Sequence, residues 1–134
     1  MSNEYYIFNL VEYLKTSLPG YSFTCNGQQS GSAADLIDVS ESGGMEKNNF
    51  DRKDFTFTIV SYSNNKLTAR IQGNEVNNLI QKKYGLTLPS VTIDSIIYPT
   101  VKTWKIAALS LLGFVGNDER GRAMFSANYS LTTE

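Results

Sequence analysis

The amino-acid sequence predicts an α+β fold, in which two α-helices pack on one face of a single, mostly antiparallel β-sheet that ends in a long C-terminal β-hairpin. Two segments carry apolar residues at helical spacing, strand-like segments separate them, and the end of the chain alternates in polarity. The 134 residues, of which 41% are hydrophobic, are enough for a single domain over residues 1–134 with one core.

The first predicted helix covers residues 4–18. Its apolar stripe consists of Ile7, Leu10, Val11, Leu14 and Leu18. Ser2 or Asn3 can cap the start of this helix, and Pro19 followed by Gly20 ends it. The stripe is expected to face the sheet.

Two short strands are predicted next, at residues 21–25 and 36–40. The first alternates in polarity and ends at an Asn-Gly turn signal, and the second is closed by the sequence ESGG at residues 41–44. The small polar residues 27–34 between the two strands predict an exposed loop. This loop is rich in glycine, but it lacks the lysine and the following helix that define a phosphate-binding loop.

Residues 45–54, MEKNNFDRKD, allow two interpretations. The even mixture of charges favours a solvated hairpin loop. The alternative is an arm that becomes ordered only against a neighbouring subunit, with Phe50 as its apolar anchor. Phe50 and Arg52 are therefore candidate interface residues.

Residues 55–62, FTFTIVSY, form the clearest strand and are expected at the centre of the sheet. Phe55, Phe57 and Ile59 share one face, and β-branched and aromatic residues fill nearly every position. Alternation of this kind predicts that the face with Phe57 belongs to the core.

A second helix is expected over residues 65–84. Ser63 or Asn64 can cap its start, and Gly85 can end it in a left-handed turn. Gly73 lies in mid-helix, where glycine costs about 1 kcal/mol relative to alanine. Its presence predicts that the helix packs closely on the sheet at this point.

Three further strands are predicted at residues 91–98, 101–113 and 122–132. Pro99 predicts a corner or an edge position between the first two. The run IAALSLLGF within the second could form a short helix, but the last strand needs a hairpin partner, which favours a strand. The last strand alternates over its whole length, as no helix does.

Composition excludes several classes of function. The chain has no histidine, which removes Ser-His and Cys-His catalysis and most transition-metal sites. No cofactor motif is present, so we expect neither an enzyme nor a bound cofactor or metal. Cys25 is the single cysteine and permits no internal disulfide; it is expected to be a small apolar residue in a strand.

Charge and hydropathy limit the partners. The formal net charge of −1 provides no basic excess of the kind that proteins use to bind nucleic-acid phosphates. No apolar run approaches the length needed to cross a bilayer, and the N-terminus does not resemble a signal peptide. The chain is therefore expected in the cytosol when it is made, without a membrane partner.

Four charged residues lie at the tip of the predicted last hairpin: Asp118, Glu119, Arg120 and Arg122. In the simplest interpretation they are solvated, and the positive φ angles of the turn come from Gly116-Asn117 and Gly121. Acid-base catalysis by the adjacent carboxylates is disfavoured, because neighbouring side chains in a turn point in different directions. A recognition tip is the third interpretation, since arginine and carboxylate forks suit a neighbour with the reverse pattern.

The order of elements and the closing segment FVGNDERGRAMFSANYSLTT, residues 114–133, resemble the small tail terminator and minor capsid proteins, or head-tail joining proteins, of long-tailed bacteriophages. These proteins tend to close with an apolar residue and glycine, an acidic pair, an arginine-bearing turn, and a Phe-Ser strand that ends near an asparagine. The matching positions are Phe114 to Gly116, Asp118-Glu119, Gly121-Arg122, Phe125-Ser126 and Asn128-Tyr129. The resemblance covers most of the chain in element order and its C-terminal end in motif.

This resemblance implies a structural protein whose copies form a ring, expected to be a hexamer, on the head-proximal end of the tail tube. The ring would stop growth of the tube protein and offer a surface to the head completion protein, while genomic DNA passes through its lumen without specific binding. The protein is then expected in the virion tail, after assembly in the host cytoplasm. The candidate interface residues are Phe50, Arg52, Asp118, Glu119, Arg120 and Arg122. Arg122→Glu is expected to impair tail completion or head joining and to leave the melting temperature nearly unchanged.

A second interpretation is a sheet that binds single-stranded nucleic acid, with Tyr62, Trp104, Phe125 or Tyr129 as stacking platforms. Aromatic residues in an alternating strand usually belong to the core, and the missing basic groove disfavours this interpretation further. A third, a small-ligand or enzyme domain, is disfavoured by the absence of histidine and of any cofactor motif.

Overall fold

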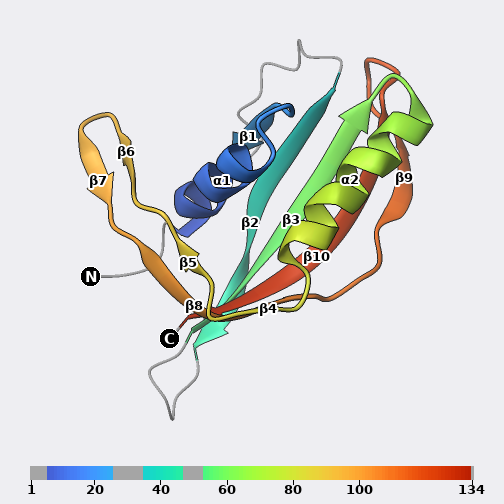
Figure 1. Cartoon of the computed structure of the whole chain (residues 1–134). Helices are drawn as coiled ribbons and strands as arrows, with labels where there is room; N and C mark the ends of the chain where they lie inside the picture. The colour runs from blue at the N-terminus through green and yellow to red at the C-terminus, as the bar shows by residue number, and fades with distance from the viewer. Residues whose placement is uncertain (1–5, 26–34, 47–52, 134) are drawn as a thin grey trace.

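The computed structural model describes residues 6–25, 35–46 and 53–133 (Figure 1). The helices are α1 (Tyr6–Ser17) and α2 (Lys66–Ile80). The strands are β1 (Phe23–Cys25), β2 (Leu36–Glu46), β3 (Lys53–Ser63), β4 (Lys83–Tyr84), β5 (Thr87–Leu88), β6 (Val91–Ile93), β7 (Ile96–Tyr98), β8 (Val101–Ala108), β9 (Gly113–Asn117) and β10 (Ala123–Thr133). The predicted α+β fold is confirmed: both helices lie in front of one twisted sheet.

The strands of the main sheet lie in the order β1-β2-β3-β10-β8-β4, with β5 also paired to β8 and β9 also paired to β10. The β1–β2 pair is parallel, and every other described pair is antiparallel. The predicted central strand is β3, between β2 and β10. It pairs with β10 continuously from Ala123 opposite Ser63 to Thr132 opposite Asp54.

One core lies between the sheet and the two helices. Four of the five residues of the predicted first-helix stripe are buried in it, and Leu18, beyond the end of α1, is partly buried. On the predicted inner face of β3, Phe57 and Ile59 are buried and Phe55 is partly buried. The ring of Phe57 stacks on that of Tyr129 with centroids 5.3 Å apart and planes 13° apart, and the Tyr6 ring lies 6.2 Å away. The Tyr129 hydroxyl donates a hydrogen bond to Asn77 Oδ1 at 2.7 Å. Burial raises the pKa of Tyr129 to about 12, so the phenol stays neutral in the core.

Strand β2 is longer than predicted. Its predicted end at Ser40 is wrong, because the residues that read as a closing turn stay paired to β3 after a register shift between Glu41 and Gly43. A β-bulge of this kind places an extra residue in one strand without ending the ladder. The strand therefore continues to Glu46.

Helix α2 begins one or two residues later than its predicted caps and ends earlier than predicted. Asn65 is the N-cap, and its side chain accepts hydrogen bonds from the N–H groups of Leu67 at 2.9 Å and Thr68 at 3.2 Å. The helix ends at Ile80 because Lys82, with a φ of 57°, turns the chain into β4. Gly85 does adopt a left-handed conformation, with a φ of 66°, but between β4 and β5 rather than at the helix end.

The segment 91–98 is a hairpin of its own instead of one strand. Strands β6 and β7 pair only with each other, with Val91 opposite Tyr98 and Ile93 opposite Ile96. Asp94 and Ser95 make the turn between them with φ angles of 52° and 67°. The hairpin extends beside α1, away from the main sheet (Figure 1). Pro99 follows it at the predicted corner into β8.

The predicted strand 101–113 is interrupted. Strand β8 ends at Ala108 and β9 begins at Gly113, and both pair with the same edge of β10. In the gap, the Leu109 N–H donates to the Asn128 carbonyl at 2.7 Å and the Asn128 N–H donates to Ser110 Oγ at 3.0 Å. The serine hydroxyl replaces a backbone partner, so the intervening residues can leave the sheet. The short helix considered for this run does not form.

Gly73 makes room for Leu112, which lies in this gap. A Cβ atom at position 73 would lie 2.8 Å from Leu112 Cδ2 and 2.9 Å from Cδ1, which is closer than such atoms can approach. Close packing at Gly73 was predicted, but its partner is the segment between β8 and β9 rather than a strand of the sheet.

Candidate protein-interaction surfaces

The charged turn between β9 and β10 is built around Asp118. Its N–H donates to the Arg122 carbonyl at 2.9 Å, and its Oδ1 accepts from the N–H groups of Arg120 at 3.0 Å and Arg122 at 2.8 Å. Gly116 and Gly121 adopt the predicted positive φ angles, 121° and 79°. Asn117, which was predicted to share this role, has an ordinary φ angle. The turn is thus held together by its own first carboxylate.

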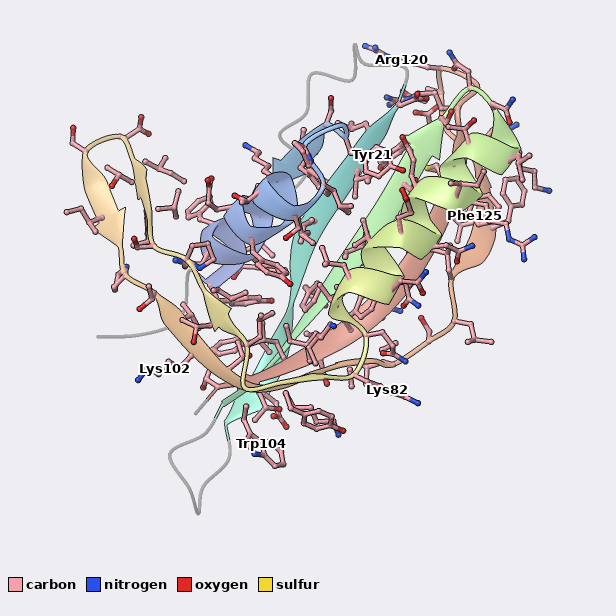
Figure 2. All side chains as sticks on the ribbon, in the orientation of Figure 1. Tyr21, Lys82, Lys102, Trp104, Arg120 and Phe125 are labelled. Carbon is pink, nitrogen blue, oxygen red and sulfur yellow. The ribbon has the colours of Figure 1, made fainter. Side chains whose placement is uncertain are left out.

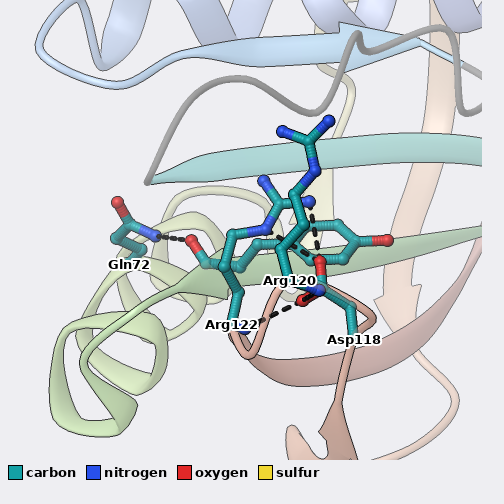
Figure 3. A network of polar contacts seen from close by, with 5 residues as sticks. Gln72, Asp118, Arg120 and Arg122 are labelled. Atoms are coloured by element: carbon teal, nitrogen blue, oxygen red, sulfur yellow. Dashed lines mark hydrogen bonds and ion pairs between the residues drawn. The ribbon is translucent and has the colours of Figure 1, made fainter.

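Arg122 is part of the folded core of this turn rather than an exposed contact. Its Nε and Nη2 atoms lie 2.8 Å and 2.7 Å from Asp118 Oδ2, and its guanidinium lies 4.8 Å from the centroid of the Tyr62 ring (Figure 3). The side chain is only 6% exposed. Burial alone would raise the pKa of Asp118, but the hydrogen bonds and the charge of Arg122 outweigh it and hold this pKa below its ordinary value.

The other candidate interface residues have different positions. Glu119 and Arg120 are exposed at the tip of the turn, and the Arg120 side chain points away from the body of the protein (Figure 2). Phe50 and Arg52 lie outside the described residues. Of the six predicted interface residues, Glu119 and Arg120 therefore present side chains on the described surface, whereas Asp118 and Arg122 bind each other.

A second surface lies on the β6–β7 hairpin, and we refer to Asp94, Ile96 and Ile97 as the hairpin surface. Ile96 and Ile97 are 56% and 70% exposed. Asp94 is the only charged residue between positions 86 and 101, and it stands in the turn. Ile96 pairs opposite Ile93 and Ile97 pairs opposite Thr92, so the two isoleucines lie on opposite faces of the hairpin. Exposed apolar side chains at the end of a projecting element are typical of an interaction site.

Asn9 of α1 fixes the base of this hairpin. Although it lies on a helix face that is otherwise apolar, it is only 2% exposed. Its Nδ2 lies within hydrogen-bonding distance of three carbonyl oxygens, those of Pro89 at 2.8 Å, Pro99 at 2.9 Å and Tyr98 at 3.3 Å. Two of these acceptors belong to prolines, which cannot donate in return. The amide therefore joins the two ends of the hairpin to α1.

A third surface lies around β9, and we refer to Lys66, Arg70, Leu111, Phe114 and Val115 as the β9 surface. Leu111, Phe114 and Val115 are 93%, 45% and 59% exposed. The Lys66 ammonium lies 4.1 Å from the centroid of the Phe114 ring, and Arg70 follows Lys66 by one helical turn. This surface combines exposed apolar groups with two cations.

Sequence reasoning missed both apolar surfaces. The hairpin was read as one strand because its turn, Asp94-Ser95, lacks the glycine or asparagine that usually marks two successive positive φ angles. The exposure of Phe114 and Val115 depends on the register shift between Met124 and Phe125, which lets β9 bulge at Val115. The excess of apolar letters in LSLLGFV was the one available signal.

A cavity of about 450 Å³ lies between α1, β1 and β6, and Glu12 and Lys15 are among the residues that line it. Its walls include Phe8, Val11 and Ile93, and Cys25 lies at one side. Burial raises the pKa of the Cys25 thiol to about 11, so the nucleophilic thiolate is scarce at neutral pH. Among the described residues, no cluster of three or more Cys, Asp or Glu side chains could hold a metal ion.

The structure removes most of the stacking platforms considered for nucleic acid. Phe125 and Tyr129 are 7% and 1% exposed and face the helices. Tyr62 lies on the open face of the sheet, but Arg122 covers part of its ring. Trp104 remains, 44% exposed. The open face beside Tyr62 carries hydroxyl and amide groups, such as Thr58, whose Oγ1 donates to Asn128 Oδ1 at 2.7 Å.

Comparison with models of known protein families and with curated proteins finds no match. No described helix combines the length and the hydropathy that a membrane span requires.

Proposed function

We propose that this chain is a structural protein of a long-tailed bacteriophage, a tail terminator that forms a ring on the head-proximal end of the tail tube. The ring would stop polymerisation of the tube and offer a surface to the head completion protein. The resemblance of residues 114–133 to such proteins motivates this proposal. The observation that supports it best is the presence of two different apolar surfaces on one subunit.

A ring requires a heterologous interface, in which one patch binds a different patch on the next copy. The hairpin surface and the β9 surface differ in composition and lie on opposite sides of the molecule (Figure 1). An isologous dimer would need only one self-complementary patch. Two unlike patches on opposite sides therefore favour a closed assembly of several copies.

Halting a polymer has a simple physical form. A terminator must bind the last tube subunit through one end of its ring and lack the same contacts at its other end. The exposed residues Glu119 and Arg120 at the charged turn are suited to such an end contact, because charged rims select partners more than they add affinity. The near-neutral overall charge suits a lumen through which DNA slides without binding.

Electron microscopy and light scattering of the purified protein test this proposal. We expect annular particles, and a mass that rises with protein concentration to a fixed multiple of the subunit. A specific antibody against the protein should also label virions at the junction between head and tail. Monomers at every concentration together with unlabelled virions would rule the function out, as would turnover of a metabolite.

The nucleic-acid interpretation keeps one supporting observation, the exposed Trp104 on β8. It predicts salt-sensitive binding of an oligonucleotide to a permanently monomeric protein. Trp104→Ala would abolish that binding. The tail terminator proposal expects no such affinity.

A further inference from the structure

We propose that the hairpin surface of one copy docks on the β9 surface of the next copy. This inference rests on the proposed ring and deepens it, because it assigns the contact between subunits to named residues. The hairpin surface, Asp94, Ile96 and Ile97, acts as the inserted element. The β9 surface, with its two cations around exposed apolar groups, receives it.

Charge complementarity supports this choice of partner. Asp94 is the only charge on the hairpin, and Lys66 and Arg70 are the only charged residues between positions 64 and 74. The segment 109–117, which includes β9, carries no charge at all. Within the described residues, neither Asp94 nor Arg70 forms an ion pair. One carboxylate and two cations are thus available for a contact between chains.

The apolar parts also match in kind. Ile97 lies on the face of the hairpin opposite Val91 and Ile93, which line the cavity beside α1. It is therefore free to enter a neighbour. Phe114 and Val115 offer an aromatic and a branched side chain on the receiving surface. Burial of such groups supplies affinity, while the charges set the orientation.

The contact is expected to use side chains rather than an added strand. A neighbour could pair with the outer edge of β9 only if that edge were regular. The register shift opposite Met124 and Phe125 and the φ angle of 121° at Gly116 make it irregular. Bulges of this kind prevent edge-to-edge pairing. The exposed side chains of β9 remain available.

The two surfaces cannot meet within one chain. The hairpin lies beside α1 at one side of the molecule, and β9 lies beyond α2 at the other (Figure 1). Each copy therefore offers an unused hairpin to one neighbour and an unused β9 surface to the other. Repetition of this contact produces the head-to-tail arrangement of a ring.

Charge reversal tests the docking. Asp94→Lys and Arg70→Glu should each weaken self-association by about tenfold or more, because like charges then face each other at the contact. Lys82→Glu is the matched control, since Lys82 is exposed just beyond the C-terminal end of α2 (Figure 2) and its reversal should change association little. Sedimentation velocity over a range of concentrations measures the association, and circular dichroism verifies the fold of each variant.

A mixture of the two variants provides the decisive measurement. When the two variants alternate, the lysine introduced by Asp94→Lys on the hairpin of one variant faces the glutamate introduced by Arg70→Glu on α2 of the other. At the next contact, the native Asp94 faces the native Arg70. An equimolar mixture should therefore recover most of the association that each variant loses alone. Ile97→Ser, at a 70% exposed position, should weaken association without lowering the melting temperature.

The outcomes separate this inference from the proposed function. Rings that form equally well with Asp94→Lys, Arg70→Glu and Ile97→Ser would overturn the docking and leave the ring intact. A mixture that stays dissociated would also overturn it. Wild-type protein that remains monomeric at every concentration would overturn both. If rings form and depend on these charges but the protein is absent from virion tails, the docking is supported and the terminator function is ruled out.

Discussion

The carboxylate of Asp118 binds Arg122 at both ends, because Oδ1 accepts from its backbone N–H and Oδ2 accepts from its guanidinium. This arrangement closes the turn and places the guanidinium on the Tyr62 ring of the neighbouring strand. A turn that looked like a row of solvated charges therefore contains a small structural core. The expectation that Arg122→Glu leaves stability unchanged has to be replaced.

Asp118→Ala is expected to lower the free energy of unfolding by about 3 kcal/mol, because it removes the carboxylate that binds the buried Arg122 guanidinium. Arg122→Glu should be at least as harmful, since it places a second carboxylate beside Asp118. Urea unfolding measures both changes. Glu119→Ala, at an exposed position in the same turn, is the control and should alter stability by no more than about 0.5 kcal/mol. Equal effects of the changes at 118 and 119 would contradict the structural role.

Acid should weaken the contribution of Asp118. Burial favours a higher pKa for this carboxyl, but its hydrogen bonds with Arg122 and Arg120 prevail, so the folded pKa lies below the ordinary value of 3.8. The unfolded chain then binds more protons than the folded chain in this range, and stability falls as the pH falls through it. The difference in unfolding free energy between the native protein and Asp118→Asn should be constant near neutrality and shrink below about pH 4. A difference that grows on acidification would refute the assignment.

Asn9→Asp should destabilise the base of the hairpin. The variant replaces a buried donor by an acceptor of the same shape, which then faces the carbonyl oxygens of Pro89 and Pro99. We expect a loss of about 3 kcal/mol at neutral pH, since a buried charge is left without a donor. Hydrogen exchange should show faster exchange in residues 91–98. Glu12→Gln, elsewhere on α1, serves as the control. Unchanged exchange in the hairpin would show that Asn9 does not anchor it.

Gly73 and Leu112 should show energetic coupling. Gly73→Ala gains about 1 kcal/mol of helix propensity, but in the native protein the new Cβ atom must displace the Leu112 methyl groups. In a Leu112→Ala background this conflict disappears. A double-mutant cycle should therefore show a larger stabilisation by Gly73→Ala in that background than in the native one. Identical effects in the two backgrounds would mean that the gap between β8 and β9 adapts freely.

Periodicity predicted the fold correctly wherever apolar side chains recur on one face of a helix or strand over many residues. The stripe of α1, the alternation of β3 and the alternation of β10 are confirmed because their burial depends on a single repeating pattern. Boundaries were less predictable. The end of α2 depends on Lys82 adopting a positive φ angle, and the end of β8 depends on a hydroxyl of Ser110 substituting for a backbone group. Neither the φ angle of Lys82 nor the hydrogen bond of Ser110 can be recognised from the local amino-acid sequence.

The candidate surfaces were harder to predict than the fold, for a physical reason. Whether a charged or apolar residue is exposed depends on partners that are distant in the chain. Arg122 is buried because Met124, two residues later, pairs opposite Tyr62, and Asn9 is buried because the chain returns to it eighty residues later at Pro89. The local sequence identifies the four charged residues of the turn. It does not show that Asp118 and Arg122 bind each other while the other two face solvent.

The short tether at the base of the hairpin sets an angle as well as a position. In a ring built by the proposed docking, the direction in which the hairpin leaves α1 determines the rotation between neighbouring copies, and hence how many copies complete the circle. An amide whose two N–H groups are directed at carbonyl oxygens from both ends of the hairpin holds that direction within narrow limits. Loosening Asn9 would then yield rings of mixed size or open spirals, even if every subunit could still bind the next.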